Sequence, residues 1–119
     1  ALELNSTLGA AHLNLANALV RQGHLEEAIQ HYEHALKIRP KSAEIYQRMG
    51  IVLAAQGHLD KAIEHFRQAL RIQPQSADVH ESLGRALAQQ GKRTEAMQHY
   101  QEALRILKSH RQQAEGNRQ

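Results

Sequence analysis

Apolar residues recur along this chain at helical spacing, in short stretches that glycine or proline separates. Met49 and Leu53 share one face of a first stretch, and Ile63 and Phe66 share one face of a second. Apolar positions three or four residues apart predict amphipathic helices. Gly57 stands between these two stretches, and glycine often follows a helix end because it adopts left-handed backbone without a Cβ clash. We therefore expect a pair of helices joined by a tight turn.

The same pattern returns every 34 residues. The columns that keep this step are Gly23, Gly57 and Gly91; Ala28, Ala62 and Ala96; Ala35, Ala69 and Ala103; and the aromatic residues Tyr32, Phe66 and Tyr100. A fixed period of this length indicates one structural unit used repeatedly, so we expect an array rather than a globule. The predicted units are residues 9–42, 43–76 and 77–110, preceded by the end of another unit at 1–8 and followed by a polar tail at 111–119. The predicted helices are 9–22, 25–38, 43–56, 59–72, 77–90 and 93–112.

Local signals support these boundaries. Ser42 and Ser76 stand where a side-chain oxygen caps the next helix, and Pro40 and Pro74 stop the preceding ones. Gly50 falls inside an expected helix, where glycine costs about 1 kcal/mol relative to alanine, so we expect packing to require it. The other small residues in this column are Ala16 and Gly84, and the apolar residues expected to fill the space beside them are Leu15, Met49 and Leu83.

These columns resemble the tetratricopeptide repeat, and the resemblance covers nearly the whole chain. It implies an all-α, right-handed superhelical solenoid of antiparallel helix pairs. Some positions depart from the family pattern. Unit one has Ala16 where glycine is usual, and unit three has Lys108 where proline is usual. At the position near the start of each unit where the family frequently has an aromatic residue, this chain has His12, Tyr46 and His80.

The resemblance also implies a function. In proteins of this family the first helices of successive units line a concave groove that takes a peptide of a partner protein. The positions that this implies for the groove are Leu13, Asn14, Asn17, Val20, Arg21, Gln47, Arg48, Ile51, Ala55, Glu81, Ser82, Arg85 and Gln89. Leu13, Val20 and Ile51 are apolar on a face where polar residues would cost nothing. Such a mixed groove suits a peptide with apolar anchors and some acidic or amide character.

Two specialised forms of the groove fit less well. Chaperone-binding members hold a terminal carboxylate with Lys, Asn and Arg side chains; Asn17 and Arg21 resemble part of that clamp, but Leu13 and Ile51 replace other parts of it. Members attached to sugar-transferring enzymes carry a ladder of asparagines. Asn14 and Asn17 resemble one rung, and the residues that break the ladder are Arg48, Ile51, Ser82 and Arg85.

Composition argues against several other functions. The chain has no cysteine, and its net charge of +3 is spread among acidic residues without a basic stripe interleaved with aromatics, so we expect no nucleic-acid partner. No apolar run is long enough for membrane insertion. No phosphate-binding glycine loop or nucleophile elbow is present, so we expect neither an enzyme nor a cofactor.

Histidine is frequent, with nine residues. His31, His65 and His99 form a repeated column, and His31 and His34 share a helical face that is able to present two metal ligands. Because no cysteine or carboxylate cluster completes such a site, we interpret the column as half-buried packing positions and expect no metal. Because protonation of these imidazoles below neutral pH adds positive charge, we also expect the array to be less stable in acid.

We therefore predict a non-catalytic scaffold that binds a peptide or helix of another protein. Two alternatives remain open. Leu104, Ile106 and Leu107 lie where a following helix would cover them, so terminal helices are expected to be exposed and to favour self-association. The chain is also compatible with a targeting module of a larger enzyme, such as a glycosyltransferase.

Overall fold

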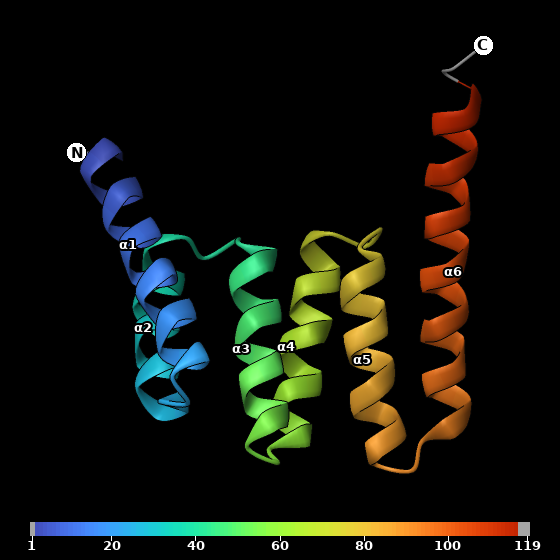
Figure 1. Cartoon of the computed structure of the whole chain (residues 1–119), viewed down its shortest axis with the longest axis horizontal. Coiled ribbons are helices and arrows are strands. Elements are labelled where there is room, and N and C mark those ends of the chain that lie inside the picture. Colours follow the sequence, from blue (N-terminus) through green and yellow to red (C-terminus); the bar gives the residue numbers. More distant parts are fainter. Residues whose placement is uncertain (1, 117–119) are drawn as a thin grey trace.

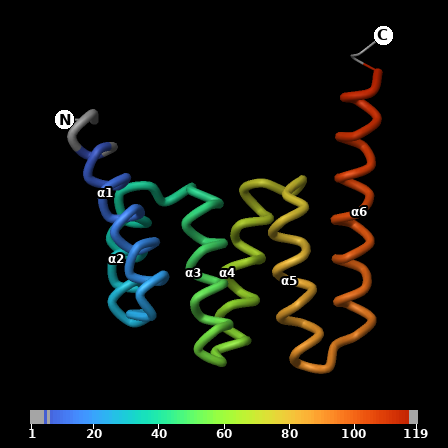
Figure 2. Tube along the Cα trace, in the orientation of Figure 1, coloured from blue at the N-terminus to red at the C-terminus, as the bar shows by residue number. Residues whose placement is uncertain are grey.

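The computed structural model describes residues 2–116, with the backbone only at residues 2–4 and 6. The described part of the chain consists of six helices that follow one another side by side (Figures 1 and 2). They are α1 (Leu2–Arg21), α2 (Leu25–Ile38), α3 (Ala43–Ala55), α4 (Leu59–Ile72), α5 (Ala77–Gln89) and α6 (Arg93–Gly116). Each odd-numbered helix pairs with the helix that follows it, which gives a solenoid of three antiparallel pairs. The predicted fold class is confirmed.

Four of the six helices match the sequence prediction to within one residue at both ends, and the two terminal helices are longer than expected. α1 begins at Leu2 rather than at residue 9, because no proline or turn residue interrupts the segment before Gly9. α6 continues to Gly116 rather than ending at 112, and an ion pair one helical turn apart, Arg111–Glu115 at 3.3 Å, supports its last turn. The prolonged ends of α1 and α6 extend toward the same edge of the array (Figure 1).

The turn inside each pair depends on one glycine. Gly23, Gly57 and Gly91 have φ values of 83°, 86° and 83°, which is left-handed backbone. Around Gly57, the N–H of His58 donates to the carbonyl of Leu53 at 2.9 Å, and the N–H of Gly57 donates to Ala54 at 3.0 Å. These two bonds satisfy carbonyls at the helix end and reverse the chain within three residues.

The helices that open the second and third pairs begin at serine caps, as the sequence predicts. The hydroxyl of Ser42 accepts a hydrogen bond from the N–H of Ile45 at 3.3 Å, and Ser76 accepts from Val79 at 3.4 Å. These bonds satisfy backbone donors that the helix itself leaves unpaired.

Removing either cap should weaken the array. We expect Ser42→Ala and Ser76→Ala each to lower the free energy of unfolding by about 1 kcal/mol, because each leaves a helix N-terminus uncapped. Chemical denaturation followed by circular dichroism measures the change. Ser109→Ala, at an exposed position inside α6, is the matched control and should leave the midpoint unchanged. Equal midpoints for all three variants would contradict the prediction.

The core lies between the two helices of each pair, where small residues permit close contact. A Cβ built on Gly50 would lie 2.6 Å from the Phe66 ring, and one built on Gly84 would lie 2.7 Å from the Tyr100 ring. Ala62 on α4 is completely buried at the same seam. The expectation that packing requires glycine at these two places is confirmed, because any side chain would overlap the aromatic ring.

Neighbouring pairs are joined by the second helix of one pair and the first helix of the next. Ile63 and Leu70 of α4 contact the apolar cluster that contains Leu83 of α5. In the preceding joint, Ile29 and Leu36 of α2 contact the cluster that contains Met49 of α3. Each joint therefore repeats the same apolar contact 34 residues further along the chain.

Leu15 does not fill the interior as expected. It is 46% exposed, whereas its repeat equivalents Met49 and Leu83 are 4% and 1% exposed. The reason is that the second helix of a preceding pair, which would cover this position, does not lie against α1 in the described chain. Ile106 was expected to be exposed at the end of the array, and this expectation is wrong because Ile106 is buried within its own helix pair. Leu104 and Leu107 are exposed, as expected.

Candidate peptide-binding groove

The positions predicted to form a groove all lie on the first helices of the three pairs, α1, α3 and α5. Most of these side chains reach solvent. The exposed members are Asn14, Arg21, Arg48, Ile51, Ala55, Glu81, Arg85 and Gln89, and the half-buried members are Asn17, Val20, Gln47 and Ser82. The surface that they form is polar at its edges and apolar around Ile51, which is 46% exposed.

A hollow of about 240 Å³ lies between α3 and α5 on this surface. It contains five of the predicted positions, namely Ile51, Ala55, Ser82, Arg85 and Gln89. The remaining lining residues, Ala54, Phe66 and Ala86, were not predicted. Phe66 comes from α4, and its ring lines the hollow next to Gly50, which has no side chain. The repeated aromatic and glycine columns of the sequence were the signal from which this contribution of Phe66 could have been predicted.

The prediction that Leu13 lines the groove is wrong. Leu13 is buried in the cluster that includes Tyr32 and Ile45. Its repeat equivalents are Gln47 and Glu81, whose polar side chains extend toward solvent from the same helical position. Because this position borders both groove and core, an apolar side chain turns toward the core, where it loses contact with water. Val20 is half-buried and packs against the same cluster.

Asn17 has a structural partner. The buried hydroxyl of Tyr32 donates a hydrogen bond of 2.5 Å to the Asn17 side-chain oxygen. Burial raises the pKa of Tyr32, and the nearby Arg48 guanidinium opposes that rise. The oxygen of Asn17 therefore satisfies a core hydroxyl, which accounts for an asparagine at this position without a carboxylate clamp or an asparagine ladder.

Two arginines on the groove face are each held by a glutamate one helical turn earlier. Arg48 pairs with Glu44 at 3.2 Å, and Arg85 pairs with Glu81 at 2.7 Å. All four side chains are largely exposed, so these pairs add little to stability. Their effect is to hold the arginine side chains along the helix surface, with Arg85 at the wall of the hollow.

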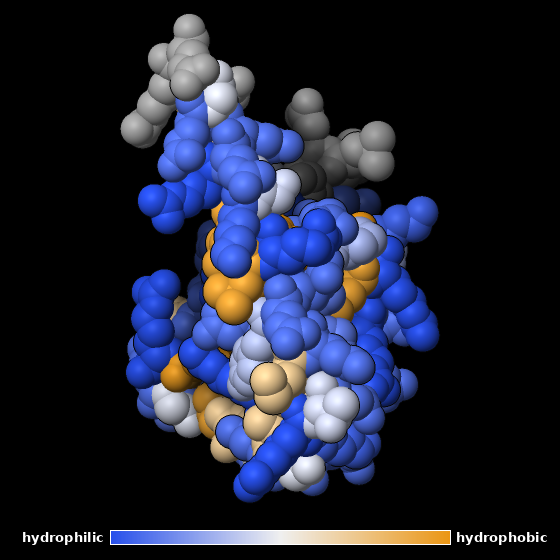
Figure 3. All heavy atoms as spheres, turned by 90° about the vertical axis from the view of Figure 1, so that its right-hand side faces the viewer, coloured by the Kyte–Doolittle hydropathy of each residue, from blue (hydrophilic) through white to orange (hydrophobic). Residues whose placement is uncertain are grey.

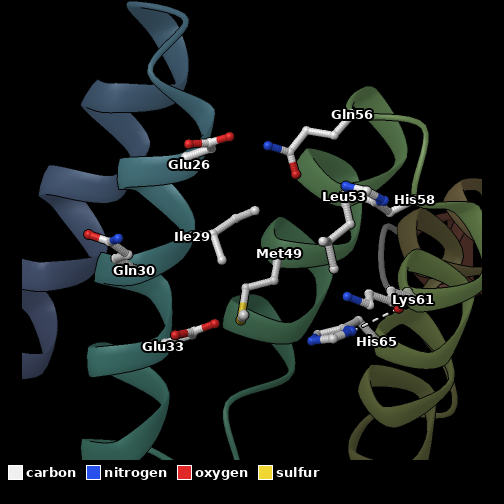
Figure 4. Close-up of a pocket in the computed structure, with 10 residues that line it drawn as sticks. All are labelled: Glu26, Ile29, Gln30, Glu33, Met49, Leu53, Gln56, His58, Lys61 and His65. Atoms are coloured by element: carbon white, nitrogen blue, oxygen red, sulfur yellow. Dashed lines mark hydrogen bonds between the residues drawn. The ribbon is translucent and has the colours of Figure 1, made fainter.

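A larger pocket of about 480 Å³ lies at the joint between the first two pairs (Figure 4). Ile29, Met49 and Leu53 give it an apolar floor, and Glu33 of α2 faces Lys61 of α4 across it. The equivalent polar groups are bonded in the next joint: Arg67 pairs with Glu95 at 3.8 Å, and the Gln90 side chain donates to Asp60 at 2.5 Å. A pocket of about 430 Å³ at that next joint is lined by the bonded residues Asp60, Arg67 and Gln90. Sequence reasoning did not identify either pocket.

Histidines of the repeated column, His31, His65 and His99, are half-buried as the sequence predicts, and His80 beside His99 is buried. The Nε2–H of His80 donates to the carbonyl of Pro74 at 3.0 Å, which leaves the His80 Nδ1 as an acceptor for the Nδ1–H of His99 at 3.0 Å. Burial lowers the pKa of His99; His80 and Arg67 lower it further, while Glu95 and Glu102 oppose the shift. His99 therefore takes up a proton less readily than a free imidazole does.

The first pair of helices contains a similar contact. His12 and His31 approach with Nδ1 atoms 3.1 Å apart, and His34 stacks on His12. Among the described side chains, no group of three or more His, Asp or Glu residues is placed to hold a metal ion. In the described part of the chain, no helix is both long and apolar enough to cross a membrane.

The lowered pKa of His99 predicts acid sensitivity. An unfolded imidazole titrates near pH 6.5, so below that value the unfolded chain binds this proton more readily than the folded chain does. Stability is therefore full above about pH 6.5 and decreases as the pH falls through and below it. We expect a lower melting temperature at about pH 5 than at about pH 7.5.

A substitution isolates the contribution of this histidine pair. His80→Tyr copies the Tyr46–His65 contact that the second pair already contains, and it should make the acid-induced drop in melting temperature smaller. His110→Tyr, at an exposed position of α6, should leave the drop unchanged. A melting temperature of the unmodified chain that is the same at both pH values would refute the prediction.

Comparison with known proteins gives a consistent result. Two family models described as tetratricopeptide repeat match residues 6–75 and 48–111. Among solved structures, the one titled "Crystal structure of MamA" has a TM-score of 0.84 and 26% identity over 87% of this chain and 61% of that chain. "Crystal structure of MamA protein" has a TM-score of 0.79 and 28% identity over 88% of this chain and 57% of that chain.

The chain thus spans about three fifths of the length of these MamA structures. The curated protein sequences contain no match to it. Repeats of the matched kind generally serve as non-catalytic protein-interaction modules. The repeated sequence columns, the helix pairs and the two family matches together show that the chain belongs to the tetratricopeptide repeat family.

Proposed function

We propose that this chain is a protein-interaction scaffold that binds an extended or helical peptide segment of a partner protein across α3 and α5. The observation that carries the proposal is Ile51. It is a large apolar side chain, 46% exposed, at the edge of a hollow whose base is apolar. An exposed apolar residue beside such a hollow is a suitable contact for an apolar anchor of a ligand.

The polar residues around the hollow favour a ligand of particular chemistry. Arg85 and Gln89 line its α5 side, and Ser82 adds a hydroxyl. Arg85 exchanges its exposed bond to Glu81 for a ligand carboxylate at little cost, because exposed ion pairs are weak. We therefore expect a peptide with an apolar anchor flanked by an acidic or amide side chain.

The test begins with a displayed library of random peptides selected against the unmodified chain. Affinities of the selected peptides are then measured by fluorescence anisotropy. Ile51→Lys should weaken binding by roughly tenfold or more, because it removes the exposed apolar contact beside the hollow. Arg85→Glu should weaken acidic peptides most.

A matched charge reversal serves as the control. Arg93→Glu changes an exposed arginine at the start of α6, outside the hollow, and should leave affinity unchanged. The proposal fails if the selected peptides bind Ile51→Lys as tightly as the unmodified chain, or if they depend on Arg93 as strongly as on Arg85.

A further inference from the structure

The two ends of the array carry apolar side chains that the interior of the same array buries. Of the seven large apolar residues that are exposed among the described side chains, five lie on the terminal helices: Leu8 and Leu15 on α1, and Met97, Leu104 and Leu107 on α6. Figure 3 faces the α6 end and shows hydrophobic patches among hydrophilic atoms.

The repeat relation identifies what would cover these residues. Met97 is equivalent to Ile63 of α4, and Leu104 is equivalent to Leu70. Ile63 is 5% exposed, whereas Met97 is 58% exposed and Leu104 is 57% exposed. In the second joint, Ile63 and Leu70 contact the cluster that contains Leu83 of α5. The α6 face therefore has the chemistry of a surface that receives a first helix.

The complementary surface is present on the same chain. Leu15 of α1 is equivalent to Leu83 of α5 and to Met49 of α3, the residues that fill the two internal joints. We propose that a second copy of this chain stacks its α1 onto α6 of the first, and so continues the array with the geometry of the internal α4–α5 joint. This inference does not depend on the peptide groove, which lies on a different surface.

The polar residues at the proposed contact between copies are also compatible with stacking. The positions equivalent to the hydrogen-bonded Asp60 and Gln90 are Thr94 of one copy and Gln22 of the next. The positions equivalent to the ion pair Arg67–Glu95 are Gln101 of one copy and Glu27 of the next. Neither of these two contacts between copies brings like charges together, and each includes a glutamine amide that is able to hydrogen-bond. Like-charged pairs would have opposed stacking.

The prolonged helix ends add contact. Leu107 and Leu8 are equivalent to Gln73 and Ser76, which lie only three residues apart in the turn between α4 and α5. Stacked copies therefore bring Leu107 of one chain near Leu8 of the next. Both residues are exposed in the single chain.

Because α6 binds α1 and not itself, the contact is head-to-tail and each dimer keeps one free face of each kind. Such heterologous contacts continue into open assemblies unless the rotation closes a ring. Light scattering should show an average mass that rises with protein concentration. Leu15→Glu and Leu104→Glu change exposed residues, so each variant should fold normally by circular dichroism and remain a monomer.

The mixture of the two variants is the decisive sample. Leu15→Glu keeps an intact α6 face and Leu104→Glu keeps an intact α1 face, so together they should form a dimer and stop there. Ile51→Glu, in the groove, should associate like the unmodified chain. The proposal is overturned if the unmodified chain is a monomer at every concentration, if Leu15→Glu pairs with itself, or if the mixture stays monomeric.

Discussion

Gly50→Leu is expected to abolish the cooperative thermal unfolding of the array. A Cβ at this position would lie 2.6 Å from Cε1 and 2.8 Å from Cδ1 of Phe66, closer than atoms of this kind approach in folded proteins. Phe66 is 1% exposed and packs in the core cluster with Ala62 and Leu83, so moving its ring disturbs that packing. Overpacking costs about 1–3 kcal/mol, and complete loss of the packing of a buried aromatic ring costs about 3–5 kcal/mol. Together these approach the whole stability of a small domain, about 5–15 kcal/mol.

Circular dichroism during heating measures the effect, with Ala55→Leu as the matched control. Ala55 lies on the same helix and is exposed in the groove, so the same added side chain should leave the melting temperature nearly unchanged there. Gly50→Ala introduces the same Cβ beside the Phe66 ring, so it should also lower the melting temperature, but by less than Gly50→Leu because it adds no further atoms. Equal melting curves for Gly50→Leu and Ala55→Leu would refute the packing explanation.

Most helix boundaries were predictable because their signals are local. The turn at Gly57 needs one residue with left-handed backbone, and the start of α3 needs one side-chain oxygen at Ser42. Both requirements are visible in a single sequence as residue types at fixed spacing. The early start of α1 lacked such a signal, since the alignment of residues 1–8 with the ends of other units suggested a break where the helix continues.

The candidate site was predictable only in part, because helical position does not determine burial. Ile51 and Arg85 line the hollow between α3 and α5, whereas Leu13 turns into the core although it occupies a predicted groove position. The histidine contacts were even less accessible to sequence reasoning. His80 and His99 are separated by nineteen residues, and only the packing of α5 on α6 brings their Nδ1 atoms together.

A second large effect should show how far damage travels along the array. Ala62 and Ala96 are repeat equivalents, both buried at the seam between the helices of a pair. Ala62→Asp places a carboxylate where it has neither water nor a partner, at a cost of several kcal/mol. The middle pair contacts both other pairs, so its loss removes both joints. We expect the whole chain to lose its cooperative transition.

Ala96→Asp introduces the same chemistry in the last pair, which has only one neighbouring pair in the chain. Because a solenoid is stabilised by nearest-neighbour contacts, the first two pairs should remain folded while about a third of the helical signal is lost. Limited proteolysis should then cut α5 and α6 first in Ala96→Asp and all helices together in Ala62→Asp. Ala88→Asp, at an exposed position of α5, controls for the charge itself. If Ala62→Asp and Ala96→Asp unfolded to the same extent, the chain would behave as one cooperative domain, and the joint between the second and third pairs would be stronger than nearest-neighbour stacking requires.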